Sequence, residues 1–368
     1  MIRSSEGFVV PLVAVALALL SLAVWAAADV SGKLNRGLEA RRDRLRFETA
    51  AATAEARIAH LFLTEPLTQR AIRVGAPRFD DPVTDRAPAI ARLLRPTQAP
   101  SGEVILDGRP YRLALDAGAG RPVWIEVQDE AGLLNLNSLE ETSIERALEL
   151  VDVAPAKARS LAAALVDFTD ADSLRRLNGA ETGEYRRAGR PPPRNTPLQS
   201  PAETANVLGW TGLSPRQQAR LREITTTALP SQSINLNTAP SVILRAALGL
   251  DERAAGIILK AREERTLVSS SDISRLAGGA ISSQLAIGSL PSRRIRITVR
   301  TGAPTSRGEL QYRSRLILAP AGSGRPVLWQ RGWVGPVRSS AQPLEPALGV
   351  PRELPASPAL LPAPVRRD

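Results

Sequence analysis

The chain begins with a short polar stretch that is followed at once by a long apolar run. Residues 1–7 are mostly polar, whereas residues 8–28 contain no charged side chain. A helix over that run would be about 30 Å long, which matches the hydrocarbon core of a bilayer. A secretory signal peptide has a shorter apolar core, followed by a small-residue cleavage site. We therefore predict a transmembrane helix over residues 8–28 that remains on the mature protein.

Beyond this segment, apolar residues continue along one side of a helix. They lie at spacings of three, four and seven residues: Leu34, Leu38, Leu45, Ala52, Ala59 and Phe62. Spacings of this kind place side chains on one helical face. The charged residues 41–44 lie on the polar side, and Pro66 ends the pattern. We predict a stalk helix over residues 29–65 with one apolar stripe.

Alternating apolar and polar residues predict strands in two separate parts of the chain. The first set follows a loop region at 67–100 that is rich in Pro, Arg and Asp. The predicted strands span 103–107, 111–116 and 123–127 in the first set, and 294–300, 310–318 and 327–334 in the second. Strands of this pattern have one buried and one wet face.

The residues between the two sets are helical in pattern. The predicted fold class is therefore α+β, with an N-terminal transmembrane and stalk helix followed by an antiparallel sheet module over 66–133 and 291–334. A large all-helical insertion over 134–290 interrupts that sheet. Residues 335–368 are dense in proline with little periodicity, and we predict a disordered tail.

The insertion contains a repeat. Leu134-Asn-Leu-Asn-Ser138 recurs as Ile234-Asn-Leu-Asn-Thr238, and the second copy leads into 248–262, which resembles a helix-hairpin-helix unit. That unit binds DNA backbone through hairpin amides and a helix N-terminus. Here the hairpin carries Asp251 and Glu252, whose charges suit the helix dipole but repel phosphate. We favour a packing role, so nucleic acid is not an expected partner. A membrane-anchored helix-hairpin-helix DNA-binding protein remains the alternative.

The amino-acid composition excludes several classes of function and of binding site. The net charge is +11, but the arginines are scattered through every segment and no five-residue block is wholly basic. The chain has no cysteine, which excludes disulfides, thiolate metal sites and a cysteine nucleophile. His60 is the only histidine, and no nucleophile motif or phosphate loop is present. We do not expect an enzyme.

Acidic residues cluster within the insertion. Asp167, Asp170 and Asp172 lie within six residues, and Glu181 follows after Asn178-Gly. Carboxylates grouped in this way can supply oxygen ligands to a hard cation such as calcium. The Gly and the twelfth-position Glu of an EF-hand are missing. The other interpretation is a solvated helix end with capping aspartates.

The junction between the polar stretch and the apolar run has a further significance. Gly7-Phe8 resembles the cleavage site of type IV prepilins and type II secretion pseudopilins, whose leader ends in Gly and whose mature chain begins with Phe. The resemblance implies that a prepilin peptidase cuts after Gly7 and methylates Phe8. Most of these proteins carry Glu at the fifth mature position, which is Leu12 here. Pseudopilins of the K class lack that Glu.

Several strings of the insertion resemble the same K class, also called general secretion pathway protein K. They occur in the family's order: Val127-Gln-Asp-Glu-Ala-Gly-Leu-Leu-Asn-Leu-Asn137, Asp167-Phe-Thr-Asp-Ala-Asp172, Asn178-Gly-Ala-Glu181 with Tyr185, Pro193-Arg-Asn-Thr-Pro-Leu-Gln-Ser200 with Glu203, and Ile234-Asn-Leu-Asn-Thr-Ala239. The resemblance implies a pilin-like sheet module with a helical insertion, and calcium bound at Asp170, Asp172 and Glu181, with Asp167 as a further candidate.

The resemblance also implies a role and a location. It predicts a minor pseudopilin at the tip of the type II secretion pseudopilus, needed for export across the outer membrane and for starting or limiting assembly. The expected partners are the I-class and J-class minor pseudopilins, the prepilin peptidase and the inner-membrane secretion platform. The protein would be a single-pass inner-membrane protein with its C-terminal bulk in the periplasm.

Overall fold

The computed structural model describes most of the chain. The described residues are 9–74, 102–113, 123–138, 140–227, 233–267, 269–278, 286–288, 290–301, 310–318, 327–336 and 352–355. Residues 1–50 form one compact unit and residues 51–368 form a second.

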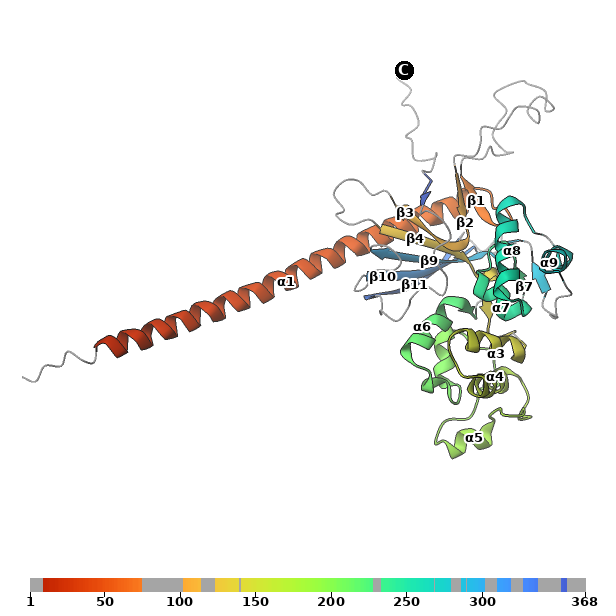
Figure 1. Cartoon of the computed structure of the whole chain (residues 1–368), viewed down its shortest axis with the longest axis horizontal. Helices are drawn as coiled ribbons and strands as arrows, with labels where there is room; N and C mark the ends of the chain where they lie inside the picture. Colours follow the sequence, from red (N-terminus) through yellow and green to blue (C-terminus); the bar gives the residue numbers. More distant parts are fainter. Residues whose placement is uncertain are drawn as a thin grey trace, which may run out of the picture. The chain divides into compact units, whose positions relative to one another are not determined.

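The first element is one long helix, α1, which runs from Val9 to Thr64 (Figure 1). The predicted membrane segment and the predicted stalk are thus two parts of one helix. Pro11 lies in its first turn, where a missing N–H group costs little. By length and composition, α1 is the one helix in the described part of the chain that could cross a membrane.

The apolar stripe predicted for the stalk is only partly correct. Between residues 51 and 64 the buried apolar side chains are Ala51, Ala54, Ile58, Ala59, Leu61 and Phe62. Ala52 is exposed, and so are Leu34, Leu38 and Leu45. At about 100° per residue, Ala54, Ile58 and Leu61 project on the side of the helix away from Ala52, so most of the predicted stripe does not face the protein core. The buried face is the one against the sheet, where Tyr312 donates a hydrogen bond to Glu55 over 3.1 Å.

The main sheet has six strands. In spatial order they are β11 (Val327–Pro336), β10 (Leu310–Leu318), β9 (Arg294–Thr301), β4 (Val123–Asp129), β3 (Asp107–Leu113) and β12 (Arg352–Glu353). Neighbouring strands are antiparallel except β12, which is parallel to β3. β4 and β9 pair directly although the whole insertion lies between them in sequence. The prediction of an antiparallel sheet interrupted by an insertion is therefore confirmed.

Two short elements were not predicted. β1 (Ala71–Val74) pairs with β2 (Gly102–Ile105) in a separate antiparallel sheet, so the expected loop at 67–100 is wrong for 71–74. β12 lies inside the segment 335–368, which was expected to be disordered. Next to β12, the N–H of Leu354 donates to the carbonyl of Arg112 over 2.9 Å, and the Leu354 side chain is buried.

The insertion between β4 and β9 is mainly helical. Its helices are η1 (Glu130–Gly132), α3 (Glu141–Leu150), α4 (Pro155–Thr169), α5 (Thr182–Arg187), η2 (Pro201–Asn206), η3 (Trp210–Gly212), α6 (Pro215–Ile224), α7 (Ser241–Leu248), α8 (Glu252–Glu264) and α9 (Ser270–Ala277). Four very short strands accompany them: β5 (Leu134–Asn135), β6 (Thr225–Thr226), β7 (Ser233–Asn235) and β8 (Ala286–Gly288). The insertion is therefore not all-helical as predicted.

The repeated Asn-Leu-Asn motif has the same structural role in both copies. Asn137 accepts the N–H of Leu198 over 2.7 Å and donates to its carbonyl over 2.8 Å. Asn237 makes the same pair of bonds to Leu267, both over 2.8 Å. Each motif strand also pairs in parallel with a strand from later in its own copy, β5 with β6 and β7 with β8. The insertion is thus a duplicated unit, and each amide side chain fastens a later loop.

Buried arginines join the sheet to the insertion. Arg296 of β9 donates to the carbonyls of Arg222, Glu223 and Thr225 at 2.9, 3.0 and 2.7 Å, which satisfies the C-terminal end of α6. Arg262 of α8 lies 2.9 Å from Asp107 of β3. Both arginine side chains are almost fully buried. Part of the arginine excess therefore has a structural use.

Asp129 is the central acceptor at the same junction. It is fully buried and accepts hydrogen bonds from the N–H and hydroxyl of Ser292 at 2.8 and 2.7 Å and from the Thr238 hydroxyl at 2.9 Å. Burial nevertheless raises the pKa of this carboxyl, against the hydrogen bonds that lower it. The residue ties the end of β4 to the second Asn-Leu-Asn motif and to the start of β9.

Candidate functional site

The predicted acidic residues lie between the end of α4 and the start of α5. Asp167 is in the last turn of α4, Asp170 follows that helix, and Glu181 precedes α5. The C-terminal end of a helix carries partial negative charge, so carboxylates there need a compensating cation. Arg176 supplies one, with nitrogen atoms 3.5 Å from Asp167 and 3.6 Å from Asp170.

Several oxygen atoms of this region are buried without a hydrogen-bond partner. They are both carboxylate oxygens of Glu181, Oδ1 of Asp170 and Oδ1 of Asn195. Burying an oxygen without a partner costs roughly 1–3 kcal/mol, and more when the group is charged. Unsatisfied oxygens gathered in one region are what a site for a hard cation provides.

The charges of these residues act on one another. Burial raises the pKa of Glu181, and the charges of Asp167 and Asp170 raise it further. Burial likewise raises the pKa of Asp170, with Asp172 adding to the effect and Arg176 opposing it. The carboxylates thus act on one another through space, although ten or more residues separate some of them in the sequence.

Two of the predicted residues are already engaged. Asp167 is buried, and its oxygens accept the backbone N–H of Arg176 at 3.3 and 3.2 Å. Asp172 is exposed, and its Oδ1 accepts the N–H of Leu174 over 2.8 Å. In the described part of the chain, no three carboxylate or histidine side chains are grouped closely enough to hold a metal ion. The carboxylates are gathered, but Arg176 and backbone amides occupy part of the cluster.

Asn195 is a residue of this site that the sequence did not single out. Its side-chain nitrogen donates to the carbonyl of Asp172, which leaves its Oδ1 buried and without a partner. Its φ of 49° places it in the left-handed region, where asparagine is one of the tolerated residues. The only sequence signal was its place in the string 193–200, where nothing indicated a role for the side chain.

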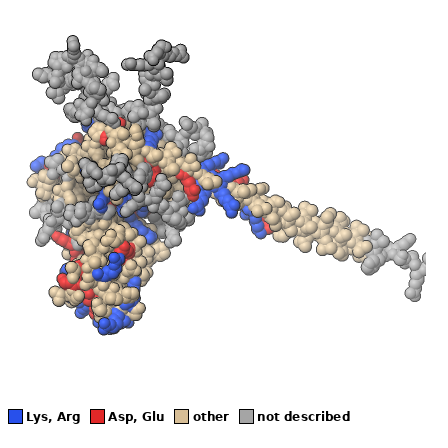
Figure 2. All heavy atoms as spheres, turned by 180° about the vertical axis from the view of Figure 1, so that it is seen from behind, with Lys and Arg blue, Asp and Glu red and all other residues tan. Residues whose placement is uncertain are grey.

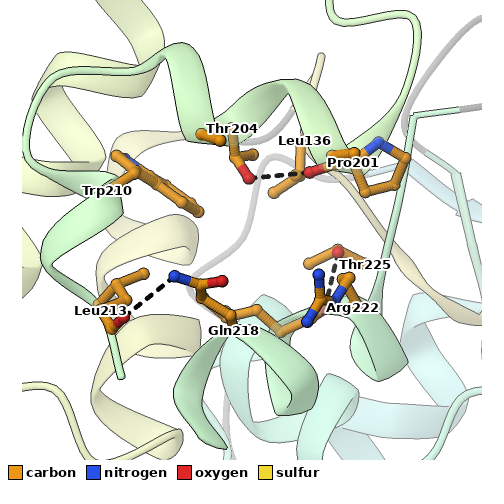
Figure 3. Close-up of a pocket in the computed structure, with 11 residues that line it drawn as sticks. Leu136, Pro201, Thr204, Trp210, Leu213, Gln218, Arg222 and Thr225 are labelled. Atoms are coloured by element: carbon orange, nitrogen blue, oxygen red, sulfur yellow. Dashed lines mark hydrogen bonds between the residues drawn. The ribbon is translucent and has the colours of Figure 1, made fainter. Parts of the chain in front are cut away.

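A small cavity lies elsewhere in the insertion, between η2, η3 and α6 (Figure 3). Its walls include Leu136, Trp210 and Leu221, with Gln218 donating to the Leu213 carbonyl over 3.0 Å. Its volume is about 90 Å³. Cofactor and substrate pockets are typically about 300–1,000 Å³. This cavity is therefore a packing space and does not indicate a ligand.

The helix-hairpin-helix unit is arranged for packing. Asp251 caps α8 by accepting the N–H of Ala254 over 2.7 Å, so that amide is not free for a phosphate. Acidic and basic side chains are interspersed over the visible surface of the insertion and do not form one basic face (Figure 2). The predicted processing residues Gly7 and Phe8 lie outside the described residues.

The arrangement of helices and strands defines the fold class of the protein. It is an α+β protein in which a helix of membrane-spanning character leads into an antiparallel sheet, and a duplicated insertion separates the two halves of that sheet. Residues 132–231 match the family model of the type II secretion system (T2SS), protein K. Residues 132–231 are therefore similar to the protein K family, and the resemblance drawn from the sequence is confirmed.

A comparison with solved structures finds a chain of the GspK-GspI-GspJ complex from the enterotoxigenic Escherichia coli type 2 secretion system. The two chains share 18% sequence identity with a TM-score of 0.39, over 62% of this chain and 84% of that one. The comparison with curated proteins finds no match.

Proposed function

We propose that the protein is a minor pseudopilin at the tip of the type II secretion pseudopilus, with an assembly role and no catalytic one. The observation that carries this proposal is the protein K match over 132–231. That segment lies in an insertion within a sheet that follows a helix long and apolar enough to cross a membrane. The insertion would cap the growing end, because a domain of that width blocks addition of another subunit above it.

The long helix supplies the assembly element. In the proposal, its apolar half anchors the precursor in the inner membrane with the sheet and insertion in the periplasm. The prepilin peptidase then removes residues 1–7 and methylates Phe8. The helix next enters the pseudopilus from the secretion platform and packs with the I-class and J-class minor subunits. Export across the outer membrane depends on that tip complex.

We also propose that the acidic cluster binds calcium. The residues present fit such an ion in their chemistry, because Glu181, Asp170 and Asn195 offer buried oxygens that no hydrogen bond satisfies. Asp172 adds negative charge beside them, and Asp167 holds the loop through the amide of Arg176. Bound calcium would supply positive charge that favours the ionised forms of Glu181 and Asp170, whose pKa values burial and mutual repulsion now raise.

The DNA-binding alternative is not favoured. Its expected anion site at the start of α8 is filled by the side chain of Asp251. Salt-dependent duplex binding by residues 36–368 would revive it.

The proposal is tested by assembly in solution. Residues 36–368 should form one small complex with the corresponding parts of the I-class and J-class subunits and should not polymerise alone. Size-exclusion chromatography with light scattering gives the stoichiometry. Failure to bind either subunit, or homopolymers of this chain, would contradict the proposal.

A further inference from the structure

The outer edge of β3 holds the last described segment of the chain. β12 lies at the edge of the main sheet and pairs with β3 in parallel (Figure 1). Among the described residues, only two of the seven in β3, Tyr111 and Arg112, are paired on this side. An edge strand whose backbone groups are unpaired is a template for another strand.

The residues after β12 are held by apolar burial, by hydrogen bonds and by a close approach of two backbones. The Leu354 side chain is buried. Arg57 of α1 donates to the carbonyl of Leu354 over 3.3 Å and to that of Pro355 over 2.7 Å. The Pro355 ring lies so near Gly102 that a Cβ atom on that glycine would be 2.6 Å from it. We call the outer edge of β3, together with Arg57 and Gly102, the acceptor edge.

This segment is attached to the sheet by a long connection. β11 and β12 lie at opposite edges of the six-stranded sheet, five strand spacings apart. At about 4.8 Å per spacing the distance is roughly 24 Å. Residues 337–351 connect the two strands, and a chain of that length can reach up to about 50 Å. The segment can therefore leave the acceptor edge without any change in the rest of the sheet.

We propose that the acceptor edge binds an extended Leu-Pro segment of another protein, and that residues 352–355 occupy it as a displaceable latch from the same chain. In strand addition, main-chain hydrogen bonds supply affinity and the side chains supply specificity. A partner strand longer than β12 would pair with more of β3 and gain further hydrogen bonds. The Leu-Pro pair is what the edge selects, because one side chain is buried and the other packs on a glycine. The inference goes beyond the proposed function and does not depend on it.

The test uses the full-length protein in detergent, with a site for a specific protease inserted after Leu344. The chain then folds with its latch in place, and cleavage followed by gel filtration removes residues 345–368. A fluorescein-labelled peptide of residues 350–357 serves as the partner strand. It should bind the cut protein and raise its Tm. It should bind the uncut protein at least about tenfold more weakly, because the tethered latch competes at a high effective concentration.

Single substitutions test the contacts. Alanine in place of the peptide's Leu354 should weaken binding at least about tenfold through lost apolar burial, and a peptide of scrambled sequence should not bind. Arg57→Ala in the cut protein should weaken binding by about tenfold, because two carbonyls lose a charged donor. Arg46→Ala is the matched control on the same helix, since that side chain is 62% exposed, and it should bind as the parent does.

Failure of the folded, cut protein to bind the peptide, or equal binding by cut and uncut protein, would overturn the inference. A cleaved fragment that stays bound and does not exchange with the peptide would overturn it too, because the segment would then be a fixed structural strand. If cleavage unfolds the protein, peptide present during the cut should preserve the fold, and unfolding despite saturating peptide would contradict the inference. Dimers of the uncut protein that Leu354→Ala does not form would instead assign the acceptor edge to the tail of a second copy.

Discussion

At the scale of single residues, Glu181 carries the clearest unmet interaction in the described chain. Neither of its buried oxygens has a hydrogen bond of ordinary geometry, and burial together with three neighbouring carboxylates raises its pKa, against the N–H of Thr182 that lowers it. A carboxyl whose pKa is raised on folding makes the folded state bind more protons than the unfolded state. Stability without a cation therefore falls as pH rises from about 4, the ordinary value, through the raised pKa.

The direction of this pH dependence gives two predictions for the stability of Glu181→Gln, one without calcium and one with it. In chelator at pH 7 the variant should be more stable than the parent, because it removes a repelled charge, and the difference should vanish at about pH 3. With calcium the parent should be the more stable of the two, because the variant has lost the Glu181 carboxylate that would bind the ion. Asp172→Ala should also lose the calcium-dependent rise in Tm. Calorimetry of residues 36–368 with calcium and with chelator measures all of these.

Glu184→Gln serves as the control for that experiment. Glu184 accepts the N–H of Glu181 over 3.1 Å, and that hydrogen bond lowers its pKa. The Glu184 carboxylate therefore stabilises the fold above its ordinary pKa, and this stabilisation is lost as the pH falls through the lowered pKa. At pH 7, Glu184→Gln should be less stable than the parent. A calcium-dependent shift of the parent's size in Glu181→Gln would exclude Glu181 as a ligand, and the absence of any shift in the parent would return the cluster to a solvated helix end.

A second residue-scale prediction concerns processing. Gly7 precedes the apolar run, as the residue before a prepilin peptidase cut does. The mature protein should begin at N-methylated Phe8, and Gly7→Val should leave the precursor intact. Mass spectrometry of the N-terminus decides the matter. Intact Met1 on protein from a host with an active peptidase would contradict the prediction.

At the scale of elements, the sequence predicted those features whose pattern extends or recurs over many residues. Alternation located β3, β4, β9, β10 and β11, and the recurring Asn-Leu-Asn motif marked the two copies of the insertion. β1 and β12 were missed because strands of four and two residues depend on a partner and carry little pattern of their own. The buried side of α1 was partly missed because contacts with the sheet select it.

The candidate site shows the same limit. Local spacing identified the four carboxylates, since they are dense in the sequence. It could not identify Asn195, whose oxygen reaches the region from a separate loop. Nor could it indicate that Arg176 would lie among the carboxylates at 3.5–3.6 Å. The position of Arg176 depends on the fold of the loop between α4 and α5, and that of Asn195 on the loop after α5.

The short strand near the C-terminus yields an element-scale prediction. Leu354 is 5% exposed, and Arg57 of α1 donates to its carbonyl and, over 2.7 Å, to that of Pro355. Leu354→Ala should lower the free energy of unfolding by about 2 kcal/mol through lost apolar burial. Leu290→Ala, at a leucine that is 69% exposed, should change it by less than about 0.5 kcal/mol. Equal effects in urea unfolding would show that the tail segment does not hold the sheet edge.

At the scale of the whole molecule, the apolar helix and the compact unit belong to different parts of the chain. One helix is long and apolar enough to cross a membrane, and residues 51–368 form a compact unit that contains the sheet and the insertion. Within that unit, buried arginines and Asp129 tie the insertion to both halves of the interrupted sheet. The insertion is thereby fixed to the sheet through several buried contacts, which the proposed capping role requires.

The position of the protein in the fibre distinguishes a tip subunit from a subunit of the shaft. Pseudopili assembled with this protein present should be labelled by gold-conjugated antibody against residues 132–231 at one end only, and overproduction of the protein should shorten them. Label distributed along the length of the fibres would contradict the account.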